Sequence, residues 1–168
     1  MDGIMASINA FYSRDNSRKT IKGMTQKFEE GAFPGWAPQG YKHIVDEFTK
    51  KHVIEIDSET APLVKLAFEL YATGSYSIYS LSVQLDALGL RGRKGKTLCI
   101  GSLQGLLTNP FYWGLMRWKG KEKIGTHTPI VEKALFDNVQ YLLAKHRNFL
   151  IRDRKFNFRA SWFYADLG

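Results

Sequence analysis

Residues 61–107 have the sequence APLVKLAFELYATGSYSIYSLSVQLDALGLRGRKGKTLCIGSLQGLL. Apolar side chains recur every three or four positions in this segment, which is the period of an amphipathic helix. They form three groups: Ala61, Val64, Phe68 and Tyr71; Ile78, Leu81, Leu85 and Leu88; and Ile100, Leu103 and Leu107. Three short helices of this kind cannot each bury a face alone, so the sequence predicts that they pack together.

Short polar residues and glycines mark the expected ends of these helices. A serine or aspartate oxygen can accept hydrogen bonds from the free N–H groups of a first turn, and glycine permits the left-handed turn that follows a last one. The first helix is therefore capped by Asp57 or Ser58 and stops before Gly74. The expected helices extend through Tyr71, from Ser77 or Ser80 to just before Gly89, and from about Cys99 to Leu107.

The flanking segments predict further helices and two small hairpins. Residues 1–30 form one helix or two, with an interruption at 13–17, and residues 33–40 are too rich in Pro and Gly for regular structure. β-leaning runs at 41–45 and 52–56, and again at 115–118 and on the return to 124, indicate hairpins. A fourth amphipathic helix starts near Val131 and ends near His146. The expected fold is mainly α with small β-hairpins (α+β), with a helix-turn-helix-like core after an N-terminal helix and an extended linker. About ten residues separate its second and third helices, more than the usual turn.

The charge of the chain indicates a polyanionic partner. It has 168 residues, 24 Lys and Arg against 16 Asp and Glu, and a net charge of +8. Eight of the basic residues and a single acid, Glu122, lie between residues 91 and 123. Cations placed on phosphates release counterions and strengthen binding at low salt, although basic surfaces also occur without such a partner.

Other functional classes find little support in the sequence. A single cysteine, Cys99, excludes an internal disulfide and a zinc site built on cysteine pairs, and the four histidines lack ligand spacing, so neither metal nor cofactor is expected. No catalytic arrangement stands out. No apolar run is long enough to span a bilayer and the N-terminus does not resemble a secretory signal, which together indicate a soluble intracellular protein.

Two cationic runs and one polar helix face are the candidate nucleic-acid contacts. The first run is Arg91, Arg93, Lys94 and Lys96, and the second is Arg117, Lys119, Lys121 and Lys123. Either could instead be a solvated turn. On the third helix, Gly101, Ser102, Gln104, Gly105 and Thr108 lie opposite the apolar stripe. Their small or hydrogen-bonding side chains suit base edges in a groove, and an ordinary solvent face is the alternative.

Aromatic residues offer a second kind of contact. Phe111, Tyr112, Trp113 and Trp118 could stack on bases, but core packing is favoured for most of them because they directly follow a helix that needs a cover. Trp36 stands in the Gly/Pro segment, where it packs against a groove or pins the linker.

A series of short motifs resembles one known family. They are KGM at 22–24, EG at 30–31, PQGY at 38–41, IDSETA at 56–61, FELY at 68–71, LDALG at 85–89, LTNPFYWG at 107–114 and HTPIV at 127–131. Their order and spacing over about residues 12–147 resemble the recombinase domain of the large serine recombinases, the integrases of phages and mobile elements. Two features depart from that family: Leu98 stands where Trp is common, and the tail lacks the cysteines of a zinc ribbon.

The resemblance implies a domain that binds one half of a DNA attachment site. It places Lys19, Lys22 and Lys27 on the end of a long helix that leaves a catalytic domain, and Trp36 and Gln39 on a linker along the minor groove. The implied divisions are 1–31 (helix), 32–40 (linker), 41–147 (DNA-binding domain) and 148–168 (the start of a zinc ribbon). The parent would exchange strands through a phosphoserine link in the cytoplasm of a bacterium, as a dimer on each site and a tetramer in synapsis. This chain alone would be inactive. The alternative is a stand-alone helix-turn-helix-like regulator that binds DNA or RNA.

Overall fold

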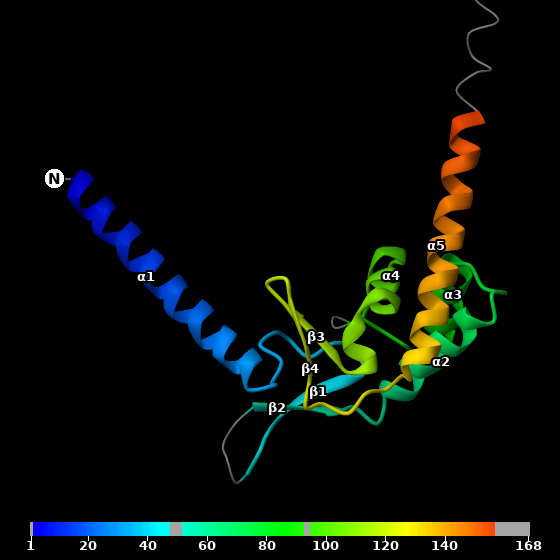
Figure 1. The fold of residues 1–168 in the computed structure, drawn as a ribbon, viewed down its shortest axis with the longest axis horizontal. Coiled ribbons are helices and arrows are strands. Elements are labelled where there is room, and N and C mark those ends of the chain that lie inside the picture. Colours follow the sequence, from blue (N-terminus) through cyan, green and yellow to red (C-terminus); the bar gives the residue numbers. More distant parts are fainter. Residues whose placement is uncertain (1, 48–51, 93–94, 157–168) are drawn as a thin grey trace, which may run out of the picture. The chain divides into compact units, whose positions relative to one another are not determined.

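The computed structural model describes residues 2–47, 52–92 and 95–156 as five α-helices, two hairpins and a short 3-10 helix (Figure 1). In chain order the elements are α1 (Asp2–Glu29), β1 (Tyr41–Val45), β2 (His52–Ile56), α2 (Ala61–Ala72), α3 (Ile78–Ala87), α4 (Ile100–Thr108), η1 (Pro110–Trp113), β3 (Leu115–Trp118), β4 (Lys121–Ile124) and α5 (Lys133–Phe156). The predicted α+β class is therefore confirmed. The chain divides into two compact units, Met1–Val64 with Pro110–Ile130 and Lys65–Asn109 with Val131–Gly168, which we call unit 1 and unit 2.

Unit 2 contains part of the predicted packing of short helices, and α2 contacts α5, where the ring centroids of Phe68 and Phe136 lie 6.2 Å apart. Helix α3 packs on α4, and α4 packs on α5. The side chains of Leu81, Leu85, Leu103, Leu107 and Val139 are fully buried between them. The Gln140 side-chain amide donates to the Leu107 carbonyl over 2.7 Å, so α5 also satisfies a backbone group at the end of α4.

The apolar stripes of α3 and α4 differ from the prediction at one position each. The sequence predicts Leu88 and Ile100 in the core, but they are 44% and 48% exposed. Leu90 is buried in the first case because Gly89, with φ of +88°, reverses the chain and lets the Leu90 N–H donate to the Leu85 carbonyl. In the second case Leu106 is buried, since α4 begins only at Ile100 and packs through Leu103, Leu106 and Leu107.

Two helices are longer than the sequence indicates. Helix α1 continues through residues 13–17, where the Ser17 hydroxyl donates to the Ser13 carbonyl and thereby stays within the helix. Helix α5 does not end near His146, as predicted, but at Phe156. No Gly or Pro occurs between these two positions, so the sequence contains no strong signal to stop the helix there.

Unit 1 is held together by an aromatic core under its two hairpins. Strands β1 and β2, and β3 and β4, pair antiparallel within the predicted ranges. Phe111 and Tyr112 are buried, as favoured from the sequence. The Tyr41 ring meets Phe111 edge-on with ring centroids 5.0 Å apart, and its hydroxyl donates to the Thr128 carbonyl. Burial raises the pKa of Tyr41 to about 12.

In the described part of the chain no helix is long and apolar enough to cross a membrane. Within the same residues, no cluster of three or more His, Cys, Asp or Glu side chains could hold a metal ion.

Candidate nucleic-acid interface

Helix α4 presents the polar face that the sequence predicts. Gly101, Ser102, Gln104, Gly105 and Thr108 are all exposed, while the buried leucines of the helix fix its opposite side in unit 2. A Cβ added to Gly101 or Gly105 would meet nothing within 4 Å, so the surface between the polar side chains is open. The Thr108 hydroxyl is already committed, because it donates to the Gln104 carbonyl over 2.9 Å. Ser102 and Gln104 are thus the side chains best placed to meet a ligand.

Cys99 begins this helix with its thiol on the surface. Its Sγ lies 3.1 Å from the Ser102 hydroxyl, and this contact lowers the pKa of the thiol. Leu98, immediately before it, is buried and anchors the incoming chain. The leucine therefore occupies a buried packing position directly before α4.

The loop before α4 carries the first cationic run. Arg91 and Thr97 form an isolated antiparallel bridge, and the Gly92 N–H donates to the Lys96 carbonyl over 2.8 Å, so the loop closes on itself. Arg91 Nη1 lies 3.0 Å from Asp86 Oδ1, an ion pair by distance but without hydrogen-bond geometry. Lys96 is exposed, whereas Arg93 and Lys94 lie outside the described residues.

The second cationic run lies on the hairpin of β3 and β4, in unit 1, and two of its four cations pair with acids. Arg117 contacts Glu122 Oε1 through both Nε (2.8 Å) and Nη2 (2.6 Å). Lys121 Nζ lies 3.8 Å from the Glu29 carboxylate, and Lys123 Nζ donates to the Glu29 carbonyl. Lys119, at the two-residue turn, and Lys123, which meets only a main-chain carbonyl, have no acidic partner among the described residues. The hairpin is therefore less positive in effect than its composition indicates.

The remaining predicted contacts also lie in unit 1. Trp36 is 79% exposed, and its neighbour Ala37 donates from its N–H to His43 Nε2 over 3.0 Å, which fastens the linker to β1. Gln39 is half-buried, and its carbonyl accepts from the Tyr112 hydroxyl. On α1, Lys19 pairs with Asp15 at 2.8 Å, Lys22 is exposed and Lys27 is half-buried.

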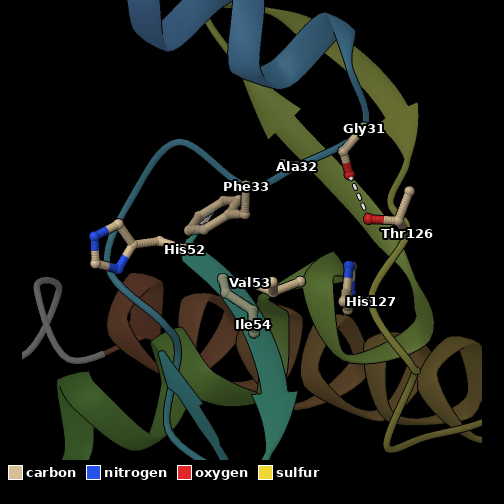
Figure 2. A pocket seen from close by; sticks show the side chains of 8 residues that line it. All are labelled: Gly31, Ala32, Phe33, His52, Val53, Ile54, Thr126 and His127. Carbon is tan, nitrogen blue, oxygen red and sulfur yellow. Dashed lines mark hydrogen bonds between the residues drawn. The ribbon is translucent and has the colours of Figure 1, made fainter. Parts of the chain in front are cut away.

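A small cavity lies in unit 1 where the chain leaves α1 (Figure 2). It encloses about 30 Å³ and is lined by Gly31, Ala32, Phe33, His52, Val53, Ile54, Thr126 and His127. This is room for about one water molecule. The His127 ring stacks on Phe111 with centroids 3.7 Å apart, and its Nε2 lies 2.8 Å from the Phe111 carbonyl. Burial lowers the pKa of His127. The cavity is too small for a base or a cofactor.

The acids that pair with cations of the hairpin are not evident from the sequence pattern alone. Glu122 lies directly across from Arg117 in the strand register, so a fixed two-residue turn at Lys119–Gly120 would have revealed that pair. No local signal connects Glu29 with Lys121 or Lys123, because more than ninety positions separate them. Also missed was a largely apolar groove beside α4 in unit 2, lined in part by Tyr76, Tyr79, Ile100 and Gln104.

The comparisons with known proteins identify the class of this domain. The Recombinase family model matches residues 58–146, which is more than half of the chain and extends from α2 into α5. The fold is thus that of a recombinase domain. The chain belongs to this family, and its resemblance to the large serine recombinases (LSRs) is confirmed.

Two solved structures share the fold. One is the crystal structure of an LSR–DNA complex, with 24% identity and a TM-score of 0.61 over 76% of this chain and 38% of that one. The other comes from work on the sequence requirements of the Listeria innocua prophage attP site, with 25% identity and a TM-score of 0.61 over 75% of this chain and 51% of that one. The chain therefore spans about half or less of the length of these proteins. No curated protein matches it.

Proposed function

We propose that this chain is a DNA-binding domain that recognises one half of an attachment site for a site-specific serine recombinase. The observation that carries the proposal is the exposed face of α4, which offers hydrogen-bonding side chains, open glycine positions and no acid. A rigid helix with such a face suits the major groove, where base edges present distinct donors and acceptors. Its family and the DNA complex among its structural relatives support the same role.

Within α4, Ser102 and Gln104 are the residues that we propose to contact bases. Both are exposed, and a glutamine amide can pair with adenine through two hydrogen bonds. Thr108 is a weaker candidate because its hydroxyl proton already goes to the helix backbone.

Phosphate contacts should come mainly from cations that no acid holds. Among the described residues, Lys96 before α4, Lys119 at the hairpin turn and Lys22 and Lys27 on α1 have no acidic partner. Arg93 and Lys94 share the loop with Lys96 in the sequence and remain proposed contacts. Arg91, Arg117, Lys121 and Lys19 would have to exchange a carboxylate for a phosphate. Trp36 and Gln39 are proposed to contact DNA from the linker.

We further propose that the parent protein, bacterial or phage-encoded, joins DNA in the cytoplasm through a phosphoserine intermediate, as a dimer on each site and a tetramer in synapsis. The support for this part is family membership. Strand cleavage is not expected of this chain alone.

The test is a selection of random duplex DNA by the purified chain, followed by fluorescence anisotropy with the selected site and a random duplex. Gln104→Ala should weaken binding to the selected site by about 1–3 kcal/mol while leaving the random duplex nearly unaffected, because base contacts carry the specificity. Gln84→Ala, an exposed glutamine on α3, is the matched control. Equal losses on both duplexes, or no sequence enrichment at all, would contradict the assignment.

A further inference from the structure

A single residue at the end of α1 contacts two cations of the hairpin, one through its carboxylate and one through its main-chain carbonyl. Glu29, the last residue of α1, receives Lys121 on its carboxylate and Lys123 on its carbonyl oxygen. Both lysines lie on β4, so one face of the strand is drawn to the helix end. The carbonyl groups of a last helical turn have no partner within the helix and attract cations, which favours this arrangement.

Contacts of a different kind fix the end of α1 itself. Phe28 is buried, and the Gly31 carbonyl accepts from both the N–H and the hydroxyl of Thr126, each over 3.1 Å (Figure 2). Gly31 has a φ of +86°, and the Ala32 N–H donates to the Lys27 carbonyl, which closes the helix with a Schellman turn. None of these contacts is ionic, so salt and competing anions should leave them in place.

The hairpin of β3 and β4 lies beyond this anchor, and its contact with α1 is the one that salt or a competing anion can change. All four residues of β4 are exposed, and a two-stranded sheet has little stability of its own. Lys121 and Glu29 are 68% and 62% exposed at 3.8 Å, and pairs of this type are weak and sensitive to ionic strength. An anion that binds lysine better than one carboxylate does can therefore replace Glu29.

We propose that Glu29 is a positioning residue that clasps the hairpin to the end of α1, and that polyphosphate anions open this clasp by taking Lys121 and Lys123. In the free protein the clasp holds the hairpin in one orientation and withholds two cations from solution. When phosphates bind them, the hairpin is released from α1 while Phe28 and Gly31 keep the helix in place. That the physiological anion is the DNA backbone rests on the proposed function.

Trp118 provides a direct readout, because it lies across from Lys121 in the register of the hairpin. The intact chain would be produced with 5-fluorotryptophan and its ¹⁹F NMR spectrum recorded, with Trp118→Phe identifying the hairpin signal. Glu29→Gln should shift and broaden the Trp118 signal. Glu30→Gln removes the same charge one residue further on and should leave the signal where it is in the parent protein. Indistinguishable spectra of the two variants would overturn the clasp.

Inorganic tripolyphosphate, added at ionic strength balanced with KCl, tests the competition without DNA. It should move the Trp118 signal of the parent protein toward its position in Glu29→Gln, and the double variant Lys121→Gln/Lys123→Gln should lose this response. A Trp118 signal that stays fixed in the parent protein, or moves equally in the double variant, would refute the exchange.

Binding of duplex DNA is tested in a separate experiment. Glu29→Gln should bind random duplex about two- to five-fold more tightly than Glu30→Gln, as expected when a weak competing ion pair is removed. If neither variant nor parent binds duplex, the proposed function fails, and the tripolyphosphate spectra still decide whether the clasp exists. Binding without a difference between the variants would count against the clasp alone.

Discussion

At the scale of single residues, His127 is a titrating side chain that packs against the aromatic rings of unit 1. Its ring stacks on Phe111 and meets Tyr41 edge-on with centroids 5.7 Å apart. The close contact of Nε2 with the Phe111 carbonyl fixes that nitrogen as the donor, so Nδ1 is bare in the neutral ring. Nδ1 is buried and has no partner among the described residues. Protonation would thus place a charge where nothing accepts its hydrogen bond.

This arrangement predicts that stability falls as the pH is lowered. Burial depresses the pKa of His127 in the folded state below its ordinary value near 6.5, so the folded protein favours the neutral ring. Its contribution to the free energy of unfolding is complete above the unfolded pKa and is lost as the pH drops through the folded pKa. Urea denaturation at pH 7.5 and pH 5.0 should show a smaller decrease for His127→Phe than for the parent.

The exposed His52 offers the control for this experiment. His52→Gln should retain the pH dependence of the parent. A His127→Phe variant with the same loss of stability on acidification as the parent would show that the buried ring is not its source.

At the scale of elements, the buried residues of α4 differ between the helical pattern of the sequence and the folded structure. In the structure, Leu106 and not Ile100 belongs to the buried stripe of α4. Leu106→Ala should therefore lower the free energy of unfolding by about 2–5 kcal/mol, the usual range for a buried leucine. Ile100→Ala, which removes a side chain that is about half exposed, should cost clearly less. Chemical denaturation of both variants checks this order, and an equal or reversed cost would support the stripe expected from the sequence alone.

Most elements could be predicted from the sequence because their signals are local. Ser77 caps α3 in a reciprocal pair with Ser80, and Gly74 has the left-handed φ that the pattern requires. Leu88 is misplaced by the prediction because helical periodicity does not show where a Schellman turn reverses the chain. The end of α5 is missed for a related reason: polar and aromatic residues alone do not stop a helix. The elements of the candidate site were expected and the pair of Arg117 with Glu122 follows from the register of the hairpin, but the pairing of Lys121 with Glu29 depends on a tertiary contact.

At the scale of the whole molecule, the net charge of +8 overstates the number of cations ready for phosphate. Salt dependence of duplex binding should show this, since the slope of log K against log salt falls by about 0.9 for each phosphate contact removed. Lys96→Ala should flatten the slope by about one such unit while keeping the sequence preference. Lys65→Ala is the matched control, because it makes the same change of charge on α2, where Lys65 pairs with Glu69 at 3.9 Å.

Anisotropy titrations between about 50 and 200 mM salt would measure both slopes. Equal slopes for Lys65→Ala and Lys96→Ala would mean that the overall charge, and not the loop before α4, determines binding.

The anchored end of α1 has a consequence for mechanics. A helix of 28 residues is about 42 Å long. A small rotation at its anchored end, the joint formed by Phe28 and Gly31, is therefore amplified at its other end. A rotation of about 10° at the joint would carry the far end through roughly 7 Å, given that length. Small substitutions at Thr126 should therefore have their largest geometric effect at the opposite end of the helix, where no side chain of the joint reaches.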